Sequence, residues 1–191
     1  MNEVVALIPV RHGSQRVENK NFRDFHQGKS LTEIKVEQLS RNSKIQETYL
    51  SSDSQEVKSL SEKLNVNFLE RDSQYTNSTT PWPEVVVNLV SKIQGNPIIV
   101  WALTTAPLFS RFNEALEIFE KMNNNDSLVG VLPRKTFFLD ENGKGINFEP
   151  GPKHPYSQQL DTYYEITGSL FIASKEVMLC LLYTSPSPRD S

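Results

Sequence analysis

Three basic residues follow the first apolar segment of this sequence. Arg11, Arg16 and Lys20 lie in the stretch IPVRHGSQRVENKN, which spans residues 8–21. An anion bound at the end of a strand needs side-chain cations, backbone N–H groups and small residues that let it approach. Because Gly13 and polar residues stand between the cations, this stretch could bind a phosphate group. The alternative interpretation is a solvated surface loop of mixed polar residues.

The stretch matches neither of two common phosphate-binding patterns. It contains no GxxxxGK[ST] loop and no GxGxxG turn, and its cations lie on both sides of a single glycine. The formal net charge of the chain is −3, so its overall charge gives no reason to expect nucleic-acid binding. The basic cluster is therefore a local feature that needs its own explanation.

Length and composition predict a globular protein. A chain of 191 residues can bury one continuous core, and its 37% hydrophobic and 23% charged content argues against a disordered or membrane protein. The apolar run at residues 4–10 is too short to cross a bilayer and lacks the basic segment of a signal peptide. The single cysteine, Cys180, excludes an internal disulfide and a multi-cysteine metal site. We expect a cytoplasmic protein that binds neither membranes nor nucleic acids.

Strand and helix patterns alternate along the chain, which predicts an α/β fold. Strands are expected at residues 4–10, 49–53, 66–69, 97–103, 127–132 and 166–173, and helices at residues 31–39, 57–64, 81–93 and 111–122 and after Ser174. This order indicates three layers, with a doubly wound, mostly parallel sheet between two layers of helices. Such sheets bind ligands beyond the carboxyl ends of their strands, where the basic stretch begins.

Two of the expected helices have specific features. Ser30, with Glu33 three residues later, predicts a capping box at the start of the first helix. The residues expected to face inward are Leu31, Ile34, Val36 and Leu39 in that helix, and Phe112, Ala115, Leu116, Ile118 and Phe119 in the helix at residues 111–122.

Two segments do not fit the alternation. Residues 134–160 have glycine, proline and polar residues without clear periodicity, which predicts an inserted loop or hairpin. Residues 180–191, which end in LLYTSPSPRDS, could be a flexible natural tail or translated unrelated DNA. We expect one domain over residues 1–179 and a disordered or non-native tail over residues 180–191.

Residues 8–21 resemble the N-terminal signature of the cytidylyltransferases that make CMP-activated acidic sugars, including the CMP-sialic acid synthetases (acylneuraminate cytidylyltransferases). The matching residues are Arg11, Ser14, Gln15, Arg16, Lys20 and Asn21. Later segments resemble later family motifs in the expected order: residues 49–53 (YLSSD), Arg71, residues 78–80 (STT), residues 103–108 (LTTAPL), residues 157–160 (SQQL) and residues 167–172 (TGSLFI). The resemblance spans residues 3–178.

The resemblance implies a nucleotide-diphospho-sugar transferase fold and a reaction of CTP with an acidic sugar. The anomeric hydroxyl would attack the α-phosphorus and pyrophosphate would leave, with Mg²⁺ assisting. The implied catalytic cations, which hold the triphosphate, are Arg11, Arg16 and Lys20. The implied nucleotide-binding residues are Gly13, Ser14, Gln15, Asn21, Arg71, Ser78, Thr79 and Thr80. The implied sugar-binding residues are Thr104, Thr105, Gln158, Gln159, Tyr164, Thr167 and Gly168.

The resemblance also implies a homodimer, because family members dimerise through the insertion matched by residues 134–160. Apolar residues on such an arm would be exposed in a monomer, and they are Phe137, Phe138, Ile146 and Phe148. The alternative is that these side chains fold back onto their own core.

Several of the implied site residues have a structural alternative. Asp53, a candidate metal ligand, could instead cap the helix that follows it. Arg71 stands between two acidic residues and could form a surface ion pair. Residues 104–107 could form only a strand-ending turn. Tyr163 and Tyr164 could be wall or core aromatics.

The sugar side of the motifs departs from the family pattern. Leu103 replaces the usual glutamine before Pro-Thr-Ser-Pro, Ser157 replaces the arginine of Arg-Gln-x-Leu, and Thr167 replaces the asparagine of the Asn-Gly segment. Sialic acid and a related acidic sugar are therefore both open as substrates. A 3-deoxy-manno-octulosonate cytidylyltransferase is a further alternative, against which the Lys20-Asn21 ending of the first motif argues.

The metal-binding aspartate pair of the family has no counterpart after Ala173, where Asp190 stands alone. A magnesium triphosphate needs carboxylate oxygens or waters to hold its metal. We therefore expect weak CTP binding and poor turnover by residues 1–191, and an inactive, truncated CTP-binding fragment is the alternative to an active enzyme. A glycosyltransferase is discounted, because the sequence has no Asp-x-Asp motif.

Overall fold

The computed structural model describes residues 3–11, 17–76, 79–123 and 125–184, with side chains through residue 180. By its internal contacts the chain divides into two units. The first comprises Met1–Val129 and Gly168–Ser191, and the second comprises Gly130–Thr167.

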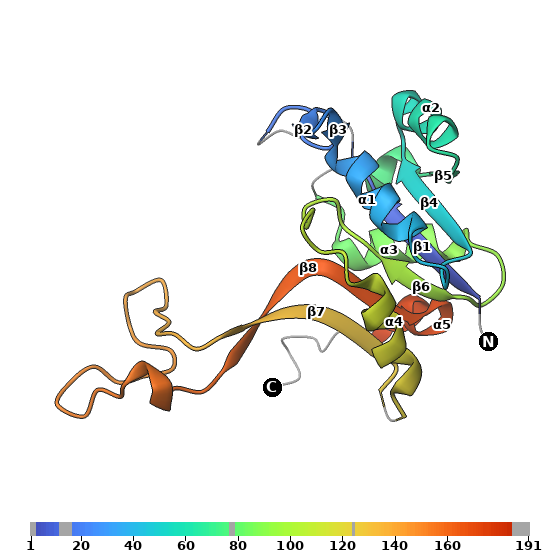
Figure 1. The fold of residues 1–191 in the computed structure, drawn as a ribbon. Helices are drawn as coiled ribbons and strands as arrows, with labels where there is room; N and C mark the ends of the chain where they lie inside the picture. Colours follow the sequence, from blue (N-terminus) through green and yellow to red (C-terminus); the bar gives the residue numbers. More distant parts are fainter. Residues whose placement is uncertain (1–2, 12–16, 77–78, 124, 185–191) are drawn as a thin grey trace. The chain divides into compact units, whose positions relative to one another are not determined.

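A six-stranded mixed sheet organises the fold, in the order β5-β4-β1-β6-β8-β7 (Figure 1). Its strands are β1 (Val4–Pro9), β4 (Glu47–Ser52), β5 (Asn67–Glu70), β6 (Ile98–Trp101), β7 (Ser127–Arg134) and β8 (Tyr163–Ser174). β1 pairs in parallel with β4 and β6, and β4 pairs in parallel with β5. β8 runs antiparallel to β6. The predicted mostly parallel, doubly wound sheet is confirmed.

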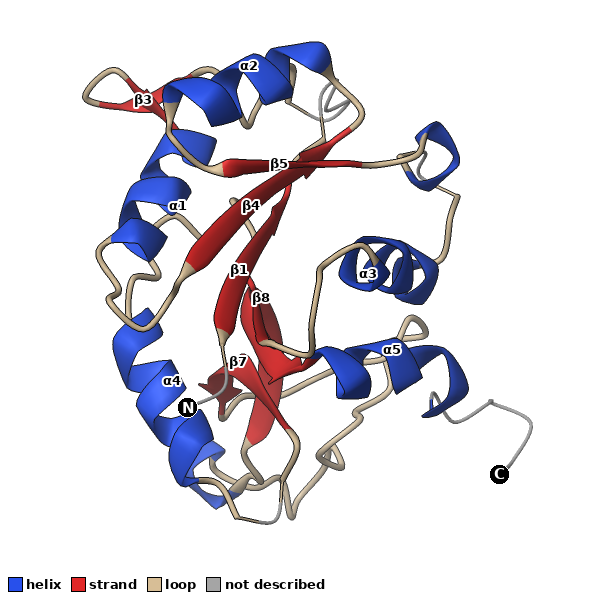
Figure 2. Cartoon of the chain, turned by 90° about the vertical axis from the view of Figure 1, so that its right-hand side faces the viewer, coloured by secondary structure: helices blue, strands red, loops and turns tan. Residues whose placement is uncertain are grey.

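Helices cover both faces of this sheet (Figure 2). On one face lie α1 (Leu31–Ser40), α2 (Gln55–Lys63) and α4 (Phe112–Lys121), and on the other lie α3 (Trp82–Ser91) and α5 (Lys175–Thr184). Each face of the sheet has its own hydrophobic core, and alternate residues of β1 pack into the two. Ala6 and Ile8 pack on the side of α1, α2 and α4, and Val5 and Leu7 pack on the side of α3 and α5. A central parallel strand is buried on both faces, which is why VVALIP contains no polar residue. The three predicted layers are therefore present.

The expected inner face of α4 is correct except at one position. Phe112, Ala115 and Leu116 are buried, and Phe119 packs partly against the same core. Ile118 is 49% exposed, so the prediction that it faces inward is wrong. Six residues after Phe112 an α-helix has turned about 240° past one full turn, which directs position 118 away from the sheet.

A short hairpin that the periodicity does not predict precedes α1. β2 (Asp24–His26) and β3 (Lys29–Ser30) pair antiparallel around Gln27 and Gly28. Both turn residues have a positive φ, 53° and 75°, as a two-residue turn between right-twisted strands requires. Strands this short leave no alternating pattern in the sequence.

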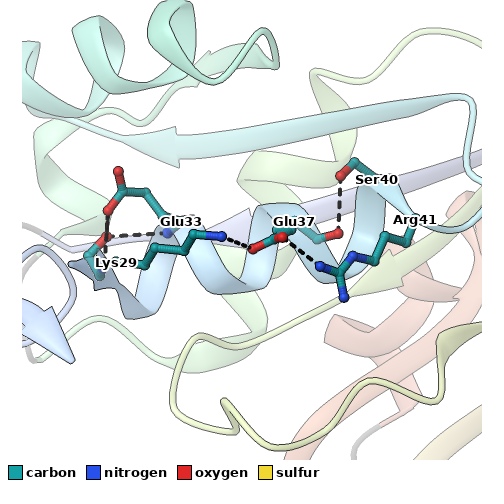
Figure 3. A network of polar contacts seen from close by, with 6 residues as sticks. Lys29, Glu33, Glu37, Ser40 and Arg41 are labelled. Carbon is teal, nitrogen blue, oxygen red and sulfur yellow. Dashed lines mark hydrogen bonds and ion pairs between the residues drawn. The ribbon is translucent and has the colours of Figure 1, made fainter. Parts of the chain in front are cut away.

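Ser30 begins α1 with the predicted capping box. Its Oγ accepts a hydrogen bond from the backbone N–H of Glu33 at 3.3 Å, and Glu33 Oε2 accepts one from the N–H of Ser30 at 2.8 Å. These two reciprocal bonds fix where the helix starts. On the exposed side of the helix, Glu37 lies between Lys29 and Arg41, with N–O distances of 2.7 and 2.6 Å (Figure 3).

Ser30→Ala is expected to lower the free energy of unfolding by about 1 kcal/mol, because alanine leaves the Glu33 N–H without its cap. Urea denaturation measures the change. Ser54→Ala is the matched control, since Ser54 is the N-cap of α2 but forms no side-chain capping bond. Its replacement should cost less, and equal losses in the two variants would contradict a stabilising capping box.

The C-terminal helix α5, expected after Ser174, begins with a side-chain cap. The N–H of Val177 donates to Ser174 Oγ at 3.2 Å. The helix runs past residue 179, where the sequence predicts the domain to end, and reaches Thr184, whereas residues 185–191 lie outside the described residues. Neither α5 nor any other helix in the described part of the chain is long and apolar enough to cross a membrane.

The second unit connects β7 to β8 largely through irregular chain, with an isolated β-bridge between Leu139 and Gly145. The rings of Phe137, Phe148 and His154 pack together within it, with centroids 4.8 to 5.2 Å apart. These aromatic residues therefore form a small cluster of their own inside the unit.

Other aromatic and apolar side chains of the second unit are exposed. The ring of Phe138 contacts that of Tyr163, with centroids 5.5 Å apart. Tyr163 and Tyr164 are both exposed, so the alternative that they are core aromatics is wrong. Ile146 is exposed as well, and the alternative that it folds back onto a core is wrong for this residue.

Candidate active site

The carboxyl ends of four strands bring predicted site residues to one edge of the sheet. From β1 the chain adds β4 and β5 on one side and then β6 on the other, so the strand order reverses between β1 and β6. Ligands of doubly wound sheets bind in the crevice at such a switch point. The residues that follow these strands are Arg11 after β1, Asp53 after β4, Arg71 after β5 and Thr104 after β6.

Asn21 bridges the chain across this switch point. Its Nδ2 donates to the carbonyl oxygen of Arg11 at 3.1 Å, and its Oδ1 accepts from the hydroxyl of Thr104 at 2.9 Å. The backbone carbonyl of Asn21 accepts from the N–H and the hydroxyl of Thr32, in the first turn of α1, at 3.2 and 2.8 Å. Asn21 and Thr104 are both buried, so their bond is shielded from water. The residue therefore ties together the chain after β1, the chain after β6 and the start of α1.

Arg71 lies buried at the same edge of the sheet. It is 7% exposed, and its Nη2 donates to the carbonyl oxygens of Ser51 at 2.8 Å and Val10 at 3.5 Å. Its Nε has no hydrogen-bond partner among the described residues. The surface ion-pair alternative is wrong, since Asp72 pairs instead with Lys92 at 3.1 Å.

Burial and two neighbouring charges shift the pKa of Arg71. Burial lowers the pKa of Arg71 to about 10, because the charged guanidinium loses its water. The carboxylate of Asp53 raises this pKa and the guanidinium of Arg11 lowers it further. Arg71 is still protonated at neutral pH, and its Nε–H can donate to a ligand oxygen.

Asp53 is exposed beside this group and does not cap the following helix. The N-cap of α2 is Ser54, so the helix-cap alternative is wrong. Within the described ranges of the chain, no three histidine, cysteine, aspartate or glutamate side chains gather as a metal site. Asp53 is therefore a single carboxylate that could contact a metal ion bound to a phosphate ligand.

Part of the predicted nucleotide side cannot be placed. The residues outside the described ranges are Gly13, Ser14, Gln15, Arg16 and Ser78. Lys20 is half-buried in the turn before Asn21. The hydroxyl of Thr80 donates to the carbonyl of Gln74 at 2.7 Å, which puts Thr79 and Thr80 just before α3. Their nucleotide contacts stay predictions, as does that of Asn21, whose amide still has one N–H and one acceptor position unused by the bonds above.

The predicted sugar side is divided between the two units. Thr104 and Thr105 follow β6, and only Thr105 is exposed. Gly168 has a φ of 65°, and a Cβ at this position would come within 3.1 Å of Leu103 Cδ1, so glycine fits here for two reasons. The residues in the second unit are Gln158, Gln159, Tyr164 and Thr167. Their sugar contacts stay predictions.

Two residues of α1 that the sequence analysis misses, Lys35 and Gln38, contact the chain after β6. A signal for Lys35 is present, because Leu31 and Leu39 stand four residues before and after it on the same face of a helix. The predicted inner face includes Ile34 instead, which is only half-buried. A lysine in line with two buried leucines indicates a buried polar contact.

A comparison with known proteins identifies a family to which this sequence is similar. A sequence profile described as cytidylyltransferase matches residues 5–165. Two pseudaminic acid cytidylyltransferases, from two strains of Campylobacter jejuni, are each 26% identical over 187 residues, and each match covers 92% of this chain and 80% of the relative.

Solved structures share the fold at lower identity. A CMP:2-keto-3-deoxy-manno-octonic acid synthetase complexed with CTP has a TM-score of 0.70 and 14% identity, with 98% of this chain and 80% of that chain covered. A 4-diphosphocytidyl-2C-methyl-D-erythritol synthase from Anaerococcus prevotii has a TM-score of 0.66 and 14% identity, with 98% and 78% covered. At these identities the likeness concerns the fold alone.

Proposed function

Because this chain belongs to the cytidylyltransferase family, we propose that it joins CTP to an acidic sugar of the nonulosonic type. The anomeric hydroxyl of the sugar attacks the α-phosphorus and gives up its proton, the bond from the α-phosphorus to the bridging oxygen breaks, and CMP-sugar and pyrophosphate are formed. The relationship with two pseudaminic acid cytidylyltransferases supports this sugar class. Pseudaminic acid and sialic acid are both candidates within it.

The observation that carries the proposal is the group of polar residues at the switch point. It consists of Arg11, Asn21, Arg71 and Thr104. Arg11, together with Arg16 and Lys20, would hold the triphosphate and stabilise the negative charge that moves to pyrophosphate. The unpartnered Nε–H of Arg71 would donate to the carbonyl oxygen of cytosine. A base without that oxygen would leave this buried N–H unpaired, which would favour cytosine over adenine.

Mg²⁺ fits this site through a small number of protein ligands. When bound with CTP, the ion offsets the charge that develops as pyrophosphate leaves. Asp53 is the carboxylate after β4 that would hold it, and Mg²⁺ commonly takes one or two carboxylates together with phosphate oxygens and waters.

The second unit supports a homodimer as part of the proposal. Its most exposed apolar and aromatic side chains are 58–77% exposed, and they are Leu139, Ile146, Tyr156, Tyr164 and Ile166. Apolar and aromatic side chains gathered on one exposed element are typical of an interface between copies.

The first test is a thermal-shift series with CTP, UTP, ATP and GTP, each with and without Mg²⁺. A ligand at about 100 times its Kd stabilises the native state by about 2.7 kcal/mol. For a domain of this size that raises the Tm by about 5–10 °C. CTP should produce this rise and ATP and GTP a smaller one at the same concentration. Equal shifts with all four nucleotides would indicate a general polyanion site and contradict the proposal.

The second test is pyrophosphate release with CTP, Mg²⁺ and one of three acids: pseudaminate, N-acetylneuraminate or 3-deoxy-manno-octulosonate. Release with either of the first two supports the proposed sugar class. Release with the third alone would replace it with another acidic sugar. CTP binding without release with any acid would favour a nucleotide-binding protein over an enzyme.

A further inference from the structure

A buried lysine in α1 holds the chain that follows β6. Lys35 is fully buried, yet within the described chain it forms no ion pair. Its Nζ donates to the carbonyl oxygens of Ala106 at 2.9 Å and Phe109 at 3.0 Å, and it lies 5.1 Å from the centroid of the Phe112 ring. Carbonyl dipoles and an aromatic face are thus the groups that stabilise this ammonium.

Burial of this charge costs free energy that an apolar side chain would avoid. Desolvation lowers the pKa of Lys35 to about 8. Leu31 and Leu39 are buried on the same helix face, so an apolar residue at position 35 would fit the pattern. Lysine supplies what leucine and methionine lack, namely N–H donors for two backbone carbonyls.

The chain over residues 104–109 forms neither helix nor strand, and side chains hold it at both ends. At its start, Thr104 donates to the amide of Asn21. Towards its end, Lys35 binds two carbonyls, and Gln38 Nε2 donates to the carbonyl of Pro107 at 2.7 Å. Hydrogen bonds therefore connect the segment to Asn21 at the switch point and to α1.

We infer that Lys35 is a positioning residue for the sugar side of the active site. By holding the carbonyls of Ala106 and Phe109, it keeps Thr104 and Thr105 in place at the end of β6, where the acidic sugar would bind. The inference rests on the proposed function and on the sugar-binding role that the family resemblance implies for these two threonines. Lys35 binds the backbone of this segment, so its loss should weaken binding of the sugar acid more than binding of CTP.

Lys35→Met keeps an unbranched side chain, one atom shorter, and removes its donors. We expect the KM for the sugar acid to rise by about tenfold, with the Kd for CTP within about threefold of the wild-type value. Hydrogen exchange in a peptide covering residues 103–110 should accelerate by about tenfold, while peptides from β1 and β4 keep their protection. Lys58→Met, at an exposed lysine of α2, is the matched control and should change none of these quantities.

Gln38→Met is the second variant, because Lys35→Met can also lower the overall stability. It removes only the donor to the Pro107 carbonyl and should change the same two quantities by a smaller factor. Unchanged exchange over residues 103–110 in both variants would overturn the inference, and so would equal weakening of CTP and the sugar acid. The exchange measurement needs no substrate. If the wild-type chain forms no CMP-sugar, the proposed function fails. The exchange measurement still tests whether Lys35 holds the segment in place.

Discussion

Arg71→Met should weaken CTP binding by about 10- to 100-fold, because a hydrogen bond from a charged donor is worth about 1.5–3 kcal/mol. The buried Nε–H has no partner among the described residues, so a ligand oxygen is the acceptor that methionine would lose. The free energy of unfolding should change little. The Ser51 carbonyl also accepts from the N–H of Val10 at 2.8 Å and therefore keeps a donor in the variant. Isothermal titration calorimetry measures the affinity, and urea denaturation measures the stability.

Two further variants make this prediction specific. Arg41→Met removes an exposed guanidinium of α1 that pairs with Glu37, and it should leave CTP binding unchanged. Arg71→Lys keeps the charge but loses the forked donor set, so it should show most of the loss. If Arg71→Met binds CTP as tightly as the wild type, then Arg71 serves only to hold the strand ends, and its nucleotide role is wrong.

The choice of nucleotide separates a base contact from a phosphate contact. If Arg71 donates to the carbonyl oxygen of cytosine, Arg71→Met should reduce the preference for CTP over ATP. A contact with the triphosphate would instead weaken all four nucleotides by the same factor, since their phosphates are identical. The competition of CTP with ATP, measured in the wild type and the variant, decides between these two roles.

The parts of the fold that the sequence predicts are those with short, regular signals. The run VVALIP needs only its own residues to indicate a strand buried on both faces. The capping box of Ser30 and Glu33 is likewise contained in four residues. The hairpin turn at Gln27 and Gly28 is missed because its strands are too short to show a period.

The contacts of the site could not be predicted, because they join residues far apart in the chain. The Asn21–Thr104 bond spans 83 positions, and the contact from Arg71 to the Val10 carbonyl spans 61. The acidic neighbours of Arg71 favour a surface ion pair when only the local pattern is considered. Its burial depends on β1 and β4, which lie beside it only after the sheet has formed. The resemblance to a family indicates that Arg71 belongs to the site, but it does not indicate that Arg71 binds the carbonyls of Val10 and Ser51.

Asn21→Leu should have the largest effect on stability, lowering the free energy of unfolding by about 3 kcal/mol. Leucine would leave the Arg11 carbonyl and the Thr104 hydroxyl without a partner, and a buried unpaired group costs about 1–3 kcal/mol. The bonds from Thr32 are retained, because they use the backbone carbonyl of Asn21. Asn67→Leu is the control, since Asn67 is exposed and its amide donates to Glu47 at 3.3 Å. Its change should stay within about 0.5 kcal/mol.

A double-mutant cycle then tests whether Asn21 and Thr104 act as one unit. Thr104→Val keeps the shape of the side chain and should cost about 1–2 kcal/mol, because it removes only the hydroxyl. The double variant Asn21→Leu/Thr104→Val should cost at least about 1 kcal/mol less than the sum of the single losses, since the bond is already lost in each. Additive losses would mean that the two residues act separately, and that the pairing of β1 with β6 alone holds the switch point together.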